Sequence, residues 1–168
     1  MKLTIRPILQ TDAETISDSF STIGWHKPAS QYRRYTREQA SGTREVLVAW
    51  AGSSFAGYCT ILWKSKYPYF RKWGIPEIMD LNVLPKFQKK KIGTRLMDRA
   101  EAIIKKRSSI AGIGVGLAPG YNAAQRMYVK RGYVPDGLGV VYRDRFVKDG
   151  ERIRIDDSLV LHFTKKII

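Results

Sequence analysis

Cysteine and histidine are scarce in this chain of 168 residues, which contains one cysteine, Cys59, and two histidines, His26 and His162. A single cysteine cannot form an internal disulfide, and it cannot supply the several thiolates of a structural zinc site. The two histidines lie far apart in the sequence, so no metal-binding motif of local spacing is present. We therefore expect a cytoplasmic protein that binds no metal ion.

Acidic residues are also few, because 15 Asp and Glu stand against 30 Lys and Arg and leave a net charge of +15. Residues 86–108 alone hold nine basic and two acidic residues. Such an excess favours an anionic partner, which could be nucleic acid, a membrane surface or a phosphorylated cofactor. A solvated surface explains the total charge equally well, but it explains the local concentration less well.

Long hydrophobic runs are few, and the one that matters most is an uncharged stretch of 18 residues, 46–63. Its centre, Gly52-Ser53-Ser54, is typical of a turn, so the stretch predicts a β-hairpin with arms at 45–51 and 55–63. The N-terminus reaches Arg6 before a signal peptide could form its apolar segment. We expect no association with a membrane.

The length and a hydrophobic content of 43% fit one domain with a proper core, over residues 1–168. Thr11 and Glu14 have the spacing of a capping box. A stripe of apolar residues from Ile92 to Ile104 follows the period of a helix. The order of the elements predicts an α/β (α+β) fold with a mixed sheet. Strands are expected at 2–5, 77–83, 110–117, 140–146 and 159–164, helices at 11–20, 28–40, from 92 onwards and at 122–131, and a loop at 64–75.

The most informative segment runs from the expected strand 77–83 through Pro85 and a lysine-rich loop into the helix that begins near Ile92. The first turn of a helix has unpaired N–H groups and the positive end of the helix dipole. Gly93 lets a ligand approach the backbone, and Thr94 adds a hydroxyl donor. Lysines 86, 89, 90 and 91 surround the same turn, so the segment predicts a binding site for an anion such as a pyrophosphate.

The residues Val83-Leu-Pro-Lys-Phe-Gln88-Lys-Lys-Lys91-Ile-Gly93 resemble the acetyl-CoA motif of the GNAT superfamily of N-acetyltransferases, V-x-P-x-x-[Q/R]-x-x-G-x-[G/A]. Lys91 departs from the motif, because a glycine is usual there. The segment 124–133 similarly resembles the second signature of the family, A-x-x-x-Y-x-x-x-G-[F/Y], with Tyr128 at the tyrosine position. The order of the expected elements also resembles the GNAT fold.

This resemblance implies a central, mostly antiparallel sheet flanked by helices, in which the strands 77–83 and 110–117 splay apart around the cofactor. It implies transfer of an acetyl group from acetyl-CoA directly to a primary amine of a small molecule, peptide or protein. The implied acetyl-CoA contacts are Leu81, Asn82, Val83, Gln88, Lys89, Lys90, Lys91, Ile92, Gly93, Thr94 and Asn122.

The resemblance also places the catalytic groups. Tyr128 would point at the departing sulfur of coenzyme A, and a carboxylate would remove the proton of the amine. Glu77 and Asp80 compete for this second role, and strand alternation puts them on opposite faces unless a bulge intervenes. Glu77 is preferred, because its distance from Gln88 resembles that in histone-type acetyltransferases. Asn122, with Gln125 three residues later, also has the chemistry of a helix cap.

Two other functions fit the sequence. The charge, interleaved with aromatic residues, fits a non-catalytic module that binds RNA or the ribosome, although no RNA-binding motif is present and nucleic acid is not the expected partner. Lys91, in place of the usual glycine, fits a protein of the same fold that binds acyl-CoA without turnover. The sequence leaves the identity of the amine open, and it leaves the oligomeric state open between monomer and homodimer.

Overall fold

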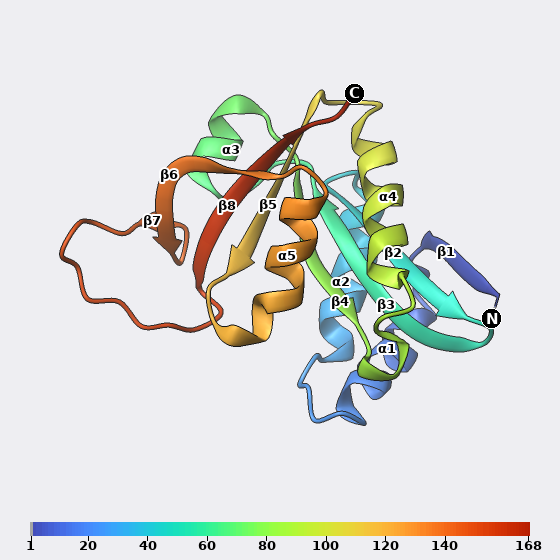
Figure 1. The fold of residues 1–168 in the computed structure, drawn as a ribbon. Coiled ribbons are helices and arrows are strands. Elements are labelled where there is room, and N and C mark those ends of the chain that lie inside the picture. The colour runs from blue at the N-terminus through green and yellow to red at the C-terminus, as the bar shows by residue number, and fades with distance from the viewer. Residues whose placement is uncertain (1) are drawn as a thin grey trace. The chain divides into compact units, whose positions relative to one another are not determined.

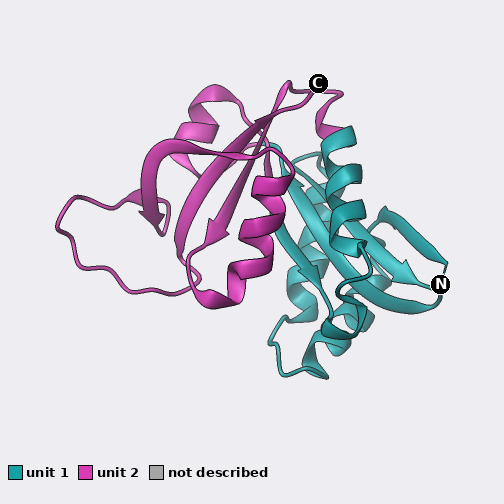
Figure 2. Cartoon of the chain, in the orientation of Figure 1, with its two compact units in different colours: residues 1–63, 79–102 teal, residues 64–78, 103–168 magenta. Residues whose placement is uncertain are grey.

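The computed structural model describes residues 2–168, and the chain forms two compact units that alternate along the sequence. Unit 1 comprises residues 1–63 and 79–102, and unit 2 comprises residues 64–78 and 103–168 (Figure 2). The chain passes from one unit to the other inside strand β4 (Glu77–Val83) and again inside helix α4 (Ile92–Ile104). The single domain expected from the sequence stays a prediction.

Unit 1 begins with a strand, two helices and a hairpin (Figure 1). These elements are β1 (Leu3–Pro7), α1 (Asp12–Ser21), α2 (Ala29–Ala40), β2 (Arg44–Ala51) and β3 (Ser54–Leu62). Strand β2 pairs antiparallel with both β1 and β3. The second part of β4, a short 3-10 turn at Pro85–Phe87 and most of α4 complete the unit. The hairpin predicted from the uncharged stretch is confirmed.

Strand β3 is buried on both faces, because successive side chains of a strand point to opposite sides. The ring of Tyr58 lies 6.0 Å from that of Phe20 in α1 and 5.5 Å from that of Tyr32 in α2, in both cases edge-on. The next residue, Cys59, has its Sγ 3.9 Å from the carbonyl oxygen of Leu96 in α4. This two-sided burial explains why β3 contains no charged residue. Across residues 2–168, no helix has the length and apolar character needed to cross a bilayer.

Unit 2 contains most of the C-terminal half of the chain. Its elements are α3 (Pro68–Trp73), the start of β4, β5 (Ile110–Gly116), a 3-10 turn at Pro119–Tyr121, α5 (Asn122–Lys130), β6 (Val134–Tyr142), β7 (Arg145–Phe146) and β8 (Leu159–Lys166). Two glycines of β5 leave space for aromatic rings to pack on the strand. A Cβ added at Gly112 would lie only 2.3 Å from the ring of Phe70, so a side chain there would clash with it. At Gly116 the added Cβ would lie 2.4 Å from the ring of Tyr121.

The strands follow the order β1-β2-β3-β4-β5-β8-β6-β7 in their hydrogen-bond ladder. The described pairs are antiparallel except β4 and β5, which run parallel and pair at Glu77 with Gly112 and at Ile78 with Ile113. The predicted mixed, mostly antiparallel sheet with helices is therefore confirmed. The ladder between β4 and β5 includes only these two pairs among the described residues.

The segment 64–75, predicted to be a loop, contains the short helix α3. Pro68 opens this helix, and Gly74 ends it with a left-handed φ of 63°. Both residues are the usual start and stop signals, but six helical residues are too few to show a helical period in the sequence.

The predicted single strand 140–146 was wrong, because it is two strands joined by a tight turn. Strand β6 starts at Val134, and β7 pairs with its end through Val141 and Phe146. The turn residues Arg143 and Asp144 have φ of 51° and 61°, a conformation usually reserved for glycine or asparagine in hairpin turns. Without glycine at the turn, the sequence pattern did not reveal it.

The predicted capping box at the start of α1 is also wrong. Thr11 is the N-cap residue, but its side chain makes no capping hydrogen bond. Asp12, the first helical residue, reaches back instead, and its Oδ2 accepts a hydrogen bond of 2.8 Å from the N–H of Leu9, which lies before the helix. Glu14 instead pairs with Arg33 of α2. The first turn of α1 therefore lacks the expected side-chain cap.

Candidate active site

The first turn of α4 carries the predicted anion site, and all of its residues belong to unit 1. The N–H of Arg95 donates to the carbonyl of Lys91 at 3.0 Å, which is the first bond of the helix. The N–H groups of Ile92, Gly93 and Thr94 lie in the first turn, where no carbonyl of the helix lies four residues before them to accept a hydrogen bond. Together with the helix dipole, these donors favour a negatively charged ligand.

Two lysines of the loop before α4 have left-handed backbone conformations. The φ angle is 59° at Lys89 and 61° at Lys91. Lys91 stands where the family motif has a glycine. The left-handed φ explains why glycine is usual there, because glycine adopts positive φ angles without a steric penalty. Left-handed residues turn successive amides toward a common point, an arrangement that binds anions. The lysine thus keeps the glycine conformation despite its Cβ.

The loop is fixed at both ends by contacts within unit 1. The side-chain amide of Gln88 donates to the carbonyl of Val83 at 3.1 Å, and the N–H of Leu84 donates to the carbonyl of Ala56 at 2.9 Å. Phe87 is buried, with the ammonium groups of Lys86 and Lys90 at 5.1 and 5.5 Å from its ring centroid. Gln88 therefore helps to shape the loop.

Strand β4 passes very close to β3 where the predicted acetyl-CoA contacts Leu81, Asn82 and Val83 lie. A Cβ added at Gly57 of β3 would stand 2.4 Å from the carbonyl oxygen of Asn82. The side-chain amide of Asn82 in turn donates to the carbonyl of Asp80 at 3.0 Å. Glycine is therefore required at position 57 for β4 to adopt this path.

Asp80 interrupts β4 with a φ of 54°, which is far from the extended conformation of a strand. Side chains do not keep alternating between the two faces of a strand across a residue in this conformation. The strand is therefore irregular at Asp80, as the second of the two expectations allowed. The Asp80 carboxylate is partly exposed, and its Oδ2 accepts a hydrogen bond of 2.5 Å from the hydroxyl of Tyr35 in α2. Non-glycine residues in this conformation are concentrated at functional sites.

Buried tyrosines support this carboxylate. The pKa values of Tyr35 and Tyr58 are both raised, mainly by burial and secondly by the negative charge of Asp80. Both hydroxyls therefore stay protonated at neutral pH. The guanidinium of Arg44 lies 4.5 Å from the Tyr35 ring centroid, and it also donates to the hydroxyl of Thr60 at 2.7 Å. Tyr35 is therefore held in place as a hydrogen-bond donor to Asp80.

Glu77, at the other end of β4, lies in unit 2 and is only 5% exposed. Its Oε2 accepts a hydrogen bond of 2.5 Å from the hydroxyl of Ser65, and its Oε1 lies 3.6 Å from Nε2 of His162. Ser65 also accepts the N–H of Tyr67 at 3.0 Å. This carboxylate is thus surrounded by buried polar partners.

The contacts of His162 were not found from the sequence, which showed only that this histidine lies far from His26. Its ring stacks on Tyr67 at 3.7 Å between centroids, with an angle of 5° between the planes. The Tyr67 hydroxyl donates to Asp136 at 2.7 Å. Sequence separations of 69 and more hide such contacts from any local pattern. Within residues 2–168, no three His, Cys, Asp or Glu side chains are grouped as a metal site requires.

The predicted residues of helix α5 also lie in unit 2. Asn122 is the first helical residue, and the N-cap position belongs to Tyr121, so the expectation that Asn122 caps the helix is wrong. Gln125 donates to the carbonyl of Gly116 at 2.9 Å and does not complete a cap. Tyr128 is 5% exposed, with its ring 6.1 Å from that of Tyr133. The structure leaves its catalytic role a prediction.

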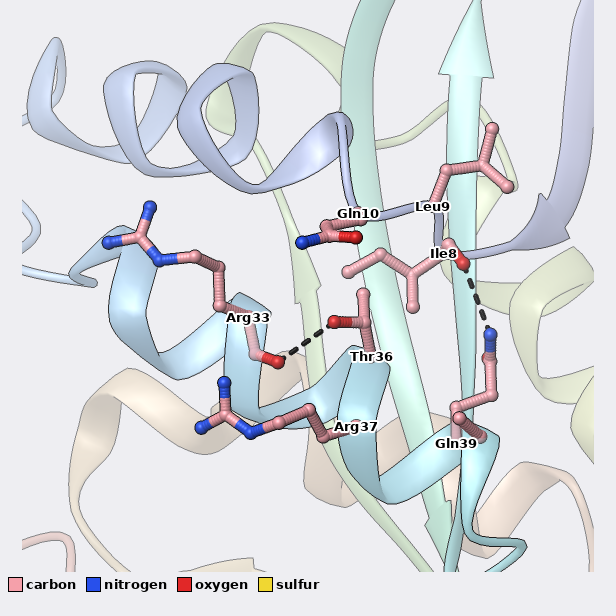
Figure 3. A pocket seen from close by; sticks show the side chains of 8 residues that line it. Ile8, Leu9, Gln10, Arg33, Thr36, Arg37 and Gln39 are labelled. Carbon is pink, nitrogen blue, oxygen red and sulfur yellow. Dashed lines mark hydrogen bonds between the residues drawn. The ribbon is translucent and has the colours of Figure 1, made fainter.

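A separate hollow of about 600 Å³ lies between residues 8–10, which precede α1, and helix α2 (Figure 3). It is lined by Ile8, Leu9, Gln10, Arg33, Thr36, Arg37, Gln39 and Ala40. The amide of Gln39 donates to the carbonyl of Ile8, and the hydroxyl of Thr36 donates to the carbonyl of Arg33. None of the predicted site residues lines this hollow, and we assign no chemistry to it.

Comparison with known proteins decides the family. The acetyltransferase (GNAT) family model matches residues 11–133, which is most of the chain and includes both motifs. The chain belongs to the GNAT acetyltransferase family. As a GNAT enzyme it is an acyltransferase that uses acetyl-CoA. Among curated proteins, none is detectably similar in sequence.

Solved GNAT structures share the fold over the whole length of the chain. An N-acetyltransferase from Staphylococcus aureus Mu50 is 15% identical, with a TM-score of 0.73 and 100% of both chains covered. A GNAT-family acetyltransferase from Streptococcus pneumoniae is 18% identical, with a TM-score of 0.69, and covers 99% of this chain and 100% of its own. The PaiA N-acetyltransferase from Thermoplasma acidophilum, in complex with coenzyme A, is 19% identical, with a TM-score of 0.65 and 99% of each chain covered.

Proposed function

We propose that this GNAT enzyme transfers the acetyl group of acetyl-CoA directly to a primary amine of a small molecule, peptide or protein. The observation that carries the proposal is the first turn of α4, where three amides without a helical partner follow two left-handed lysines. That arrangement fits the pyrophosphate of coenzyme A, in which each phosphate carries a negative charge.

The residues of unit 1 would hold the cofactor as follows. The amides of Lys89 to Thr94 bind the pyrophosphate, and the exposed ammonium groups of Lys89, Lys90 and Lys91 supply positive charge. The backbone of Leu81, Asn82 and Val83 pairs with the pantetheine arm, and one of its N–H groups polarises the thioester carbonyl. Asn122 of α5 is a further proposed contact. Acetyl-CoA supplies an activated acyl group when it is bound.

A primary amine attacks only as the neutral base, so a proton must leave it. The sequence favoured Glu77 for this role, but the geometry supports Asp80. Asp80 is partly exposed and keeps one carboxylate oxygen outside the bond with Tyr35, whereas Glu77 is 5% exposed and is enclosed by Ser65 and His162. An accessible carboxylate can take a proton directly or through one water.

Tyr128 is the proposed donor to the sulfur that leaves. An ordinary phenol, with a pKa of about 10, is a weaker acid than a thiol at about 8.5, so complete proton transfer is not strongly driven. The hydroxyl acts best as a positioned donor that stabilises the thiolate as its charge develops. A cytoplasmic location and a homodimer stay predictions from the sequence.

The deciding experiment is an assay of coenzyme A release from acetyl-CoA with a panel of polyamines, amino acids, aminoglycosides and peptides. Product mass must show a gain of one acetyl group at an amine. Release of coenzyme A with any amine, above the rate of hydrolysis, supports the proposal. Tight binding of acetyl-CoA without acetylation across the panel would favour the alternative of a binding protein without turnover.

A further inference from the structure

Helix α3 presents an exposed, strongly basic surface with an aromatic ring at its edge, and none of the assigned functions uses it. We define the α3 surface by its exposed members, Lys64, Lys66, Arg71, Lys72 and Trp73. Trp73 is 63% exposed, which is unusual for so large an apolar ring. No acidic residue occurs between Glu45 and Glu77, so the four cations have no carboxylate partner in their own segment.

The carboxylates packed near this segment are also occupied elsewhere. Asp136 accepts a hydrogen bond from the hydroxyl of Tyr67, and Glu77 is buried against Ser65 and His162. Among the described residues of the α3 surface, no ion pair with a carboxylate is formed. The positive charge therefore remains available to an external anion.

The opposite face of the same helix is fixed firmly to unit 2. Tyr67 stacks on His162, and the ring of Phe70 occupies the space above Gly112. The guanidinium Nε of Arg71 donates to the carbonyl of Ser65 at 3.0 Å, and Gly74 ends the helix. Trp73 is thus presented on a rigid support, so little conformational entropy is lost when a ligand stacks on it.

The kind of partner follows from this combination. The Trp73 ring lies 6.5 Å from that of Tyr69, and the ammonium of Lys72 lies 5.4 Å from the Trp73 centroid. Exposed aromatic rings among lysines and arginines are the usual platform for single-stranded nucleic acid, because bases stack on the rings and phosphates meet the cations. Acidic peptides would use the cations but would gain little from an indole ring.

We propose that the α3 surface binds single-stranded RNA, with a base stacked near Trp73 and phosphates on Lys64, Lys66 and Lys72. This inference is independent of the proposed acetyl transfer. The absence of an RNA-binding motif argued against such a partner in the sequence, but a surface assembled on one short helix has no motif to recognise.

The test measures binding of a fluorescent 12-nucleotide single-stranded RNA of mixed sequence by anisotropy, with the full chain, from 50 to 200 mM KCl. We expect Trp73→Ala to weaken binding at least fivefold, the lower end for loss of one stacked base. Trp73→Phe should restore part of the affinity, since it keeps an aromatic face. Circular dichroism and coenzyme A affinity should remain those of the parent protein.

The charge contribution is tested with two double variants that lose the same charge. Lys66→Ala with Lys72→Ala removes cations from the α3 surface, whereas Lys105→Ala with Lys106→Ala removes exposed cations after α4. We expect the first pair to lower the slope of log affinity against log salt by more than one, and the second pair to leave it nearly unchanged. Equal losses for both pairs, with Trp73→Ala unaffected, would overturn the proposal and leave only attraction to net charge.

A competitor distinguishes the partner class. Poly-glutamate that displaces the RNA at equal charge concentration, together with no effect of Trp73→Ala, would identify an acidic protein surface as the partner and would contradict the RNA assignment. Failure of poly-glutamate, with displacement by unlabelled single-stranded RNA, supports it. Binding that prefers duplex RNA over single strands would equally overturn the stacking model, because paired bases cannot reach the Trp73 ring.

Discussion

The polar groups considered for the active site differ between the two units in backbone conformation and exposure. Unit 1 holds Asp80, Lys89 and Lys91 in left-handed backbone conformations and leaves all three at least partly exposed. Unit 2 encloses Glu77, His162 and Tyr128, each of which is at most 5% exposed. Strained and accessible groups are typical of ligand binding, whereas enclosed groups with hydrogen-bond partners, such as Glu77, are typical of structure.

Asp80 and Glu77 make this comparison most directly, because they are three residues apart on the same strand. We expect Asp80→Asn to lower kcat/KM by about 10²-fold or more at neutral pH, the usual scale for loss of a general base. The deficit should shrink at alkaline pH, where more of the amine is already neutral. Steady-state kinetics between pH 6 and pH 10 measure it.

Glu77→Gln is the matched control, because it removes a carboxylate charge from the same strand. We expect it to keep most of the activity and to lower the free energy of unfolding, since Ser65 and His162 lose a charged partner. If Glu77→Gln shows the alkaline recovery and Asp80→Asn does not, the assignment of roles to the two units is wrong.

Tyr128 is the place where an enclosed group of unit 2 is predicted to act in catalysis. We expect Tyr128→Phe to lower kcat by roughly 10²-fold, because it removes the donor to the leaving thiolate and keeps the ring. Acetyl-CoA affinity and thermal unfolding should change little. The ring of Tyr133 lies beside that of Tyr128 in unit 2, so Tyr133→Phe serves as the control. This variant should retain nearly full kcat. Equal kcat for both variants would make Tyr128 a packing residue.

Gly93 tests the ligand-binding character of unit 1. Gly93→Asp places a negative charge at the first turn of α4, so coenzyme A affinity should fall more than tenfold, which is about 1.4 kcal/mol. Ala102→Asp adds the same charge at an exposed position of the same helix and should leave the affinity within about twofold. Isothermal calorimetry measures both. Unchanged affinity of the Gly93 variant would remove the anion site from this turn.

Asp12 shows that unit 1 also contains purely structural carboxylates. Burial alone would raise the pKa of Asp12, but hydrogen bonds from the guanidinium of Arg6 and the N–H of Leu9 outweigh burial and hold this pKa below its usual value. A lowered pKa in the folded state stabilises the fold above the unfolded value, near 3.9, and this contribution is lost as the pH falls through the folded value.

We therefore expect Asp12→Asn to lower the free energy of unfolding by about 1–3 kcal/mol at pH 7, with the difference from the parent protein shrinking below about pH 4. Urea unfolding at pH 7 and pH 3.5 measures both values. The substitution should leave kcat unchanged. A constant difference across this pH range would mean that the ionised form of Asp12 is not what stabilises the start of α1.

Much of the architecture was predictable because local patterns are strong where elements are long. Helix α4 begins at Ile92 and strand β4 at Glu77, as predicted. Gly132, predicted to end the helix before it, follows α5 with a left-handed φ of 88°. Prediction failed where six residues make a helix, as in α3, or where Arg143 and Asp144 form a turn without glycine. Short elements depend on tertiary contacts that no local period records.

The proposed anion site at residues 86–94 could be predicted from the sequence, because the helix dipole, the glycine and the lysines are local properties of this segment. The sequence also determined the mixed sheet, through hydrophobic periodicity and turn residues. Which of the two carboxylates is accessible became clear only from the folded chain. Alternation along β4 cannot anticipate the irregular backbone at Asp80, and the bonds from Tyr35 to Asp80 and from Ser65 to Glu77 join residues 45 and 12 positions apart. A carboxylate acquires its role from the groups that surround it, and folding alone brings those groups together.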